Sequence, residues 1–66
     1  MDHYEASELA EAAIGSSADG FYSAYVNGVV DSEGDTVAWV ITWKDANYSV
    51  LASARVDEDG TVTVIQ

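Results

Sequence analysis

TVAWVITWK (residues 36–44), DAN (45–47) and YSVLASARV (48–56) follow one another in the chain, and this stretch decides the fold. Both long segments alternate with the period of two that is typical of β-strands. Folding Lys44 onto Asn47 closes them into a hairpin. The expected partners are then Trp43 with Tyr48, Ile41 with Val50, Trp39 with Ala52, and Val37 with Ala54. This register gathers the large apolar side chains on one face and places Lys44 and Arg55 on the other.

A helix is expected before this hairpin. Asp2 suits its N-cap, with Glu5 completing a capping box, and Gly15 suits its C-terminal stop. Small and apolar residues recur on one side at helical spacing, namely Ala6, Leu9, Ala10, Ala13 and Ile14. Glutamates recur on the other side, namely Glu5, Glu8 and Glu11. The helix therefore has one face for a core and one acidic face.

A further strand is expected on each side of the hairpin, at 21–30 and 61–66, where β-branched and aromatic residues are frequent. Acidic loops with glycine, at 31–35 and 57–60, join these strands to the hairpin. Short loops favour a meander, so the sequence predicts one α+β domain over 1–66, with an N-terminal α-helix packed on a four-stranded antiparallel β-meander sheet. The side chains of 21–30 expected to face the core are Tyr22, Ala24, Val26 and Val30, with Gly28 opposite Trp39.

The two faces of this sheet have different expected roles. The core should contain Trp39, Trp43, Ile41, Val50, Leu9 and Ala13. The outer face should carry an apolar strip made of Tyr25, Val29, Val40, Leu51 and Ile65, beside Lys44 and Arg55. Because an apolar strip on an uncovered face is typical of an interface, we expect a homodimer or part of a partner contact there.

Charge is the outlying property of the composition. Twelve acidic residues face two basic ones, giving a formal net charge of −10. An excess of this kind repels nucleic acid and anionic membranes and attracts basic surfaces. The chain has no cysteine, no apolar stretch of membrane-spanning length, and neither a basic start nor an apolar run at its N-terminus. We therefore expect a cytoplasmic protein with no disulfide, no thiolate metal site and no membrane contact.

The meander brings many acids to one end of the sheet, because alternate loops of a meander share an end. The acids of loops 31–35 and 57–60 are expected there and are the first choice for a partner contact, namely Asp31, Glu33, Asp35, Asp57, Glu58 and Asp59. The helix glutamates are the second choice, namely Glu5, Glu8 and Glu11. Acids in turns and on helix flanks are commonly only solvated, but that explanation leaves the scarcity of lysine unaccounted for.

No pattern in the chain predicts catalysis, a cofactor or a metal site. His3 is the only histidine and lies near a terminus, so neither a catalytic base nor a metal ligand is expected there. The serines have no histidine partner in the sequence, and no glycine-rich phosphate loop is present. The two acidic loops lack the twelve-residue ligand spacing of a calcium loop, so tight turns are the expected reading.

Small size, strong acidity, the lack of cysteine and the helix-plus-meander plan together resemble the small inhibitors encoded by bacteriophages, notably anti-CRISPR proteins that act as DNA mimics. The resemblance implies a non-enzymatic inhibitor in the host bacterial cell. It implies a partner that is a basic DNA-binding protein, such as a CRISPR effector subunit, and no direct contact with nucleic acid. The alternative is a small accessory or structural domain adapted to high salt, since acidic, lysine-poor surfaces also occur there.

Overall fold

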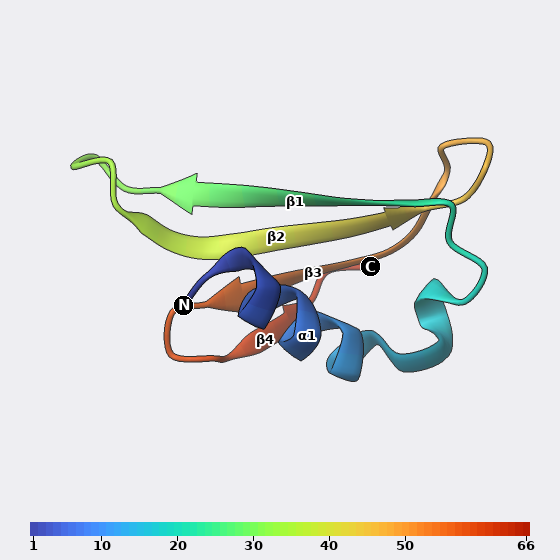
Figure 1. The fold of residues 1–66 in the computed structure, drawn as a ribbon, viewed down its shortest axis with the longest axis horizontal. Helices are drawn as coiled ribbons and strands as arrows, with labels where there is room; N and C mark the ends of the chain where they lie inside the picture. The colour runs from blue at the N-terminus through green and yellow to red at the C-terminus, as the bar shows by residue number, and fades with distance from the viewer.

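The computed structural model describes residues 1–66 and consists of one helical layer on one sheet (Figure 1). The elements are α1 (His3–Ile14), the 3₁₀ turn η1 (Gly15–Ala18), β1 (Ser23–Val30), β2 (Thr36–Lys44), β3 (Val50–Asp57) and β4 (Val62–Val64). The strands pair antiparallel in the order β1-β2-β3-β4. The expected α+β fold, with an N-terminal helix on a four-stranded meander, is confirmed. None of the helices combines the length and the apolar character needed to cross a membrane.

Both ends of α1 lie where the sequence predicts. The backbone N–H of Glu5 donates to Asp2 Oδ1 at 2.9 Å, which satisfies one of the free N–H groups of the first turn. The Glu5 carboxylate makes no hydrogen bond in return, so the capping box is only half formed. Gly15 ends the helix with φ 59°, a conformation that glycine adopts without a steric penalty.

Helix α1 packs mainly on β3 and β4 and leaves β1 largely uncovered (Figure 1). A helix with its side chains is ~10 Å wide and strands lie ~4.8 Å apart, so one helix covers about two strands. Alanines line both sides of this contact, which allows the helix to lie low over the sheet. The core comprises Ala6, Ala10, Ile14, Ala18, Ile41, Trp43, Ala52, Ala54 and Val56, with Leu9, Trp39 and Val62 packed against it.

The position of α1 corrects the expectations for β1 and for Ala13. The register of β1 is as expected, since Ala24 lies opposite Trp43 and Gly28 opposite Trp39. A Cβ added at Gly28 would lie 3.3 Å from the Trp39 ring, so glycine makes room for the indole. The other side chains expected in the core from this strand are nevertheless exposed, namely Tyr22, Ala24, Val26 and Val30. Ala13 is also exposed, because it points away from the strands that α1 covers.

The register of the central hairpin differs from the expected one. Trp43 pairs with Ala52, Ile41 with Ala54 and Trp39 with Val56, each partner lying four residues further along β3 than expected. This even displacement keeps the side chains of 39–43 and 52–56 on their predicted faces, so the sorting of apolar and charged residues survives there. The pairing shifts between Trp43 and Lys44, which places Val50 opposite Lys44. Val50 is therefore 37% exposed, and its expected place in the core is wrong.

The observed register differs from the expected one because the central turn spans 45–49. Its backbone hydrogen bonds are the same as those of the two other hairpin turns, at 31–35 and 57–61. In each turn the first N–H donates to the fifth carbonyl, and the fourth N–H donates to the first carbonyl. Asp45 Oδ1 also accepts the N–H groups of Asn47 and Ser49, which fixes a longer turn than the expected one. The fourth residue has positive φ in every turn, at 87° for Gly34, 62° for Tyr48 and 89° for Gly60.

Tyr48 is the only residue other than glycine with positive φ, which predicts strain in the turn 45–49. A left-handed conformation costs an L-residue about 1–2 kcal/mol. The Tyr48 ring also packs edge-on against Tyr22, with ring centroids 6.5 Å apart. Tyr48→Gly and Tyr48→Ala both remove this ring, but only glycine relieves the strain. In urea unfolding, we expect the Tyr48→Gly variant to be about 1 kcal/mol more stable than the Tyr48→Ala variant. An alanine variant as stable as the glycine variant, or more stable, would contradict this.

The outer face of the sheet carries the expected strip, but polar groups interrupt it. Val29, Val40 and Leu51 are half-buried, whereas Tyr25 is 42% and Ile65 57% exposed. Thr42 and Ser53 lie between them as cross-strand partners, with their hydroxyl oxygens 3.3 Å apart. The Lys44 ammonium lies 5.1 Å from the centroid of the Tyr25 ring. A homodimer through this face stays a prediction.

Candidate functional site

Six acids gather at the end of the sheet where β1 joins β2 and β3 joins β4 (Figure 1). We call this group the acidic end; its members are Asp31, Glu33, Asp35, Asp57, Glu58 and Asp59. The two loops share this end as the meander predicts, and the start of α1 lies on the same side of the molecule (Figure 1). Asp57 is half-buried and the other five are exposed.

The turn 31–35 concentrates charge most strongly. One carboxylate oxygen from each of Asp31, Glu33 and Asp35 lies within 4.8 Å of the others, and these are the residues of the chain that could share a metal ion. Asp31 has a structural role, because its Oδ1 accepts the N–H groups of Glu33 at 2.8 Å and Asp35 at 3.0 Å. The Glu33 and Asp35 carboxylates make no hydrogen bond or ion pair within the chain. These two side chains are therefore free to meet a partner.

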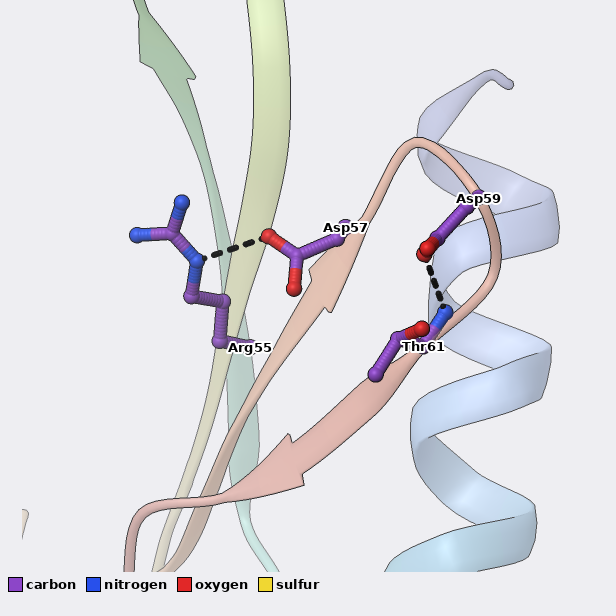
Figure 2. A network of polar contacts seen from close by, with 4 residues as sticks. All are labelled: Arg55, Asp57, Asp59 and Thr61. Atoms are coloured by element: carbon purple, nitrogen blue, oxygen red, sulfur yellow. Dashed lines mark hydrogen bonds and ion pairs between the residues drawn. The ribbon is translucent and has the colours of Figure 1, made fainter.

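The turn 57–61 also contains acids that are bonded within the chain and one acid that is free (Figure 2). The Asp57 carboxylate accepts the Nε–H of Arg55 at 3.0 Å, in the only ion pair of the chain. Residues i and i+2 of a strand share a face, so this pair was visible in the sequence and was missed. Asp59 Oδ1 accepts the N–H of Thr61 at 2.9 Å. Glu58 has no such contact, and it is the free acid of this turn.

Asp59 is the one acid whose pKa clearly departs from its ordinary value. The backbone N–H of Thr61, and then the Thr61 hydroxyl, stabilise the ionised carboxylate and lower the pKa of Asp59 (Figure 2). A lowered folded-state pKa adds stability above the unfolded-state pKa of ~3.9, and this stability is lost as the pH falls through the folded-state value. We expect Asp59→Asn to be less stable than the parent at pH 7 and equal to it at the lowest pH, measured by urea unfolding. A difference independent of pH would contradict this.

Only two of the three helix glutamates lie near the acidic end. Leu9 packs beside the turn 57–61, since a Cβ added at Gly60 would lie 4.0 Å from a Leu9 methyl carbon. The first half of α1 thus lies next to that turn, and Glu5 and Glu8 are exposed there. Glu11 lies near the other end of α1, where it lines a pocket. The predicted set Glu5, Glu8 and Glu11 is therefore split between two places.

That pocket was not predicted from the sequence. It is an open depression of about 310 Å³ between the end of α1, η1, the loop 19–21 and Trp43 of β2. Its lining consists of Glu11, Ile14, Gly15, Ala18, Asp19, Gly20, Phe21 and Trp43. The only signal in the sequence was an aromatic residue soon after an acid and a glycine, at Asp19-Gly-Phe21. The pocket itself depends on η1, which follows the end of the helix and contributes Gly15 and Ala18 to the lining.

His3 is placed for packing. Its ring centroid lies 4.1 Å from that of Tyr4 and 6.0 Å from that of Trp39, and the imidazole makes no hydrogen bond. The imidazole makes no hydrogen bond or ion pair with a serine or a carboxylate of the chain. His3 is thus the first residue of α1, and its ring packs near the Trp39 indole.

Fold and site together define a small two-layer α+β protein in which six of the twelve acids gather at one end of the sheet. Comparisons with known protein families, with curated proteins and with solved structures found no match to this chain.

Proposed function

We propose that this chain is a non-enzymatic inhibitor that binds a basic, DNA-handling surface of a partner protein and keeps DNA from it. The observation that carries the proposal is the trio of exposed carboxylates within 4.8 Å of one another in the turn 31–35. No lysine, arginine or histidine side chain pairs with them. The partner class that the resemblance implies is an effector subunit of a bacterial CRISPR complex.

Electrostatics supports a basic partner. Two unit charges ~4.8 Å apart repel by about 1 kcal/mol even in water, and less when salt screens them. The trio therefore has an unfavourable energy that a row of lysine or arginine side chains would relieve. Surfaces that bind DNA present such rows, since duplex DNA carries one charge per ~1.7 Å of its axis. A folded polyanion with a net charge of −10 competes for the same groups.

The rigidity of the turns supports tight complementarity. Glu33 and Asp35 project from a turn held by two hydrogen bonds to Asp31 Oδ1. Glu58 projects from a turn held by the hydrogen bond between Asp59 and Thr61. Backbones fixed in this way lose little conformational freedom on binding, which favours affinity. The structural acids thus position the free ones.

The test is a pull-down with purified DNA-binding effector subunits, followed by displacement of labelled duplex DNA. We expect capture of a subunit, loss of its bound DNA, and weaker capture as the salt concentration rises. Capture that is insensitive to salt would show that acid-to-base contacts do not carry the binding.

A second candidate function is an accessory domain adapted to high salt. One observation favours it: free acids also lie away from the acidic end, at Asp19 and along α1. Such a domain needs salt to screen repulsion among its carboxylates. An inhibitor from a host with ordinary salt levels folds without it.

For the inhibitor, we expect the far-ultraviolet circular dichroism spectrum and the urea midpoint to be nearly the same in 10 mM buffer and in 1 M NaCl. The core cluster contains no charged residue, so its burial does not depend on screening. Unfolding in the dilute buffer, reversed by salt, would favour the salt-adapted domain instead.

A further inference from the structure

The pocket between α1, η1, the loop 19–21 and β2 combines two chemical features. Trp43 closes its inner end, since only 2% of that residue is exposed, and Phe21 offers an accessible ring at 49% exposure. Glu11 and Asp19 add a carboxylate from either side of the η1 turn. Neither acid makes an ion pair or a side-chain hydrogen bond within the chain. The pocket thus offers an apolar, aromatic interior together with two unpaired negative charges.

We propose that this pocket binds the side chain of an arginine on the partner protein. The assignment of the arginine to a partner rests on the proposed function, but the chemistry of the pocket stands by itself. It adds a contact at a place far along α1 from the acidic end, where the proposed function assigns none.

The lining selects an organic cation over other ligands. Glu11 and Asp19 are not part of a group of three side chains that could share a metal ion, and a neutral apolar ligand would leave both carboxylates unpaired. Guanidinium is planar and weakly hydrated, stacks on aromatic faces and donates to carboxylates through a fork of N–H groups. A volume of about 310 Å³ accommodates one long side chain. Arginine therefore matches both features better than lysine, whose ammonium is a strongly hydrated point charge.

The chain cannot fill the pocket with its own basic residues. Lys44 lies over the Tyr25 ring and Arg55 pairs with Asp57, and both belong to the outer face of the sheet. These are the only lysine and arginine in the sequence. A guanidinium in this pocket must come from another molecule.

The test uses the full chain and N-acetyl-arginine-N-methylamide in low-salt buffer, followed by amide and aromatic NMR shifts. We expect shifts that concentrate at Gly15, Gly20 and Phe21 and saturate with a dissociation constant on the order of 1 mM. The uncharged citrulline analogue and the lysine analogue should each bind about fivefold more weakly or worse. Equal binding of all three compounds, or shifts spread evenly over the surface, would overturn the proposal.

Matched variants separate the pocket from general charge. Glu11→Gln with Asp19→Asn should weaken arginine binding about tenfold. Asp2→Asn with Asp45→Asn removes the same charge outside the pocket and keeps the capping oxygen of Asp2 and the turn oxygen of Asp45, so it should bind like the parent. Equal loss in both pairs would overturn the proposal. If arginine fails to bind while DNA competition persists, only the pocket is wrong; if arginine binds and competition is absent, only the proposed function is wrong.

Discussion

Replacing Trp43 by alanine should lower the free energy of unfolding by about 3–5 kcal/mol. The residue is 2% exposed and is the largest fully buried side chain of the chain. Its cross-strand partners are Ala24 and Ala52, which are too small to fill the space that the indole would leave. Since a domain of this size has only a few kcal/mol of stability in total, we expect the variant to be largely unfolded at 37 °C.

Circular dichroism during urea unfolding measures this loss, and two variants serve as controls. Trp43→Phe keeps an aromatic ring and should lose less stability. Trp39→Ala removes an indole that is only partly buried and lies opposite Gly28, so it should also cost less. A Trp43→Ala protein that unfolds at the same urea concentration as the parent would show that Trp43 is not the centre of the core.

Reversing the three free acids of the acidic end should weaken binding to a basic partner about 100-fold or more. The variant carries Glu33→Lys, Asp35→Lys and Glu58→Lys. Each exposed pair contributes less than about 1 kcal/mol, but reversal turns attraction into repulsion at three neighbouring places. The fold should persist, because none of these side chains makes a hydrogen bond or ion pair within the chain.

Compared with Glu33→Lys plus Asp35→Lys, the matched control reverses Glu5 and Glu8 to lysine, which changes the net charge equally and leaves Glu11 of the pocket in place. We expect a smaller loss, since these residues are spread along α1 instead of being gathered in a turn. A second control, Asp31→Asn, keeps the oxygen that holds the turn 31–35 and removes one charge. If both double variants lose affinity equally, net charge and not the acidic end determines binding.

The faces of the central hairpin could be predicted from the sequence, whereas its register could not. Alternation places Trp39, Ile41 and Trp43 on one face whatever the turn, provided that the displacement is even. The turn itself depends on Asp45 holding two N–H groups and on Tyr48 adopting positive φ. The position with positive φ is occupied by Tyr48 and not by a glycine, so nothing in the sequence marks this turn, and a shorter one was expected.

The exposure of β1 and the roles of individual acids depend on tertiary geometry. Alternation predicts which side chains of β1 share a face, but the width of α1 decides whether that face is covered. In the same way, turns place Asp31 and Glu33 at one end of the sheet, yet only the hydrogen bonds separate the acid that holds the turn from the acid that is free. The pocket near Phe21 depends on η1, which has no marker in the sequence.

The most direct test of the proposed function is a competition measurement on a captured effector subunit. The apparent dissociation constant of this chain is measured at increasing concentrations of duplex DNA and at two salt concentrations. We predict that it rises in proportion to the DNA concentration, because both molecules need the same basic groove, and that it is larger at the higher salt concentration. A constant value, with DNA and this chain bound to the subunit together, would contradict the proposal that the acidic end takes the place of DNA.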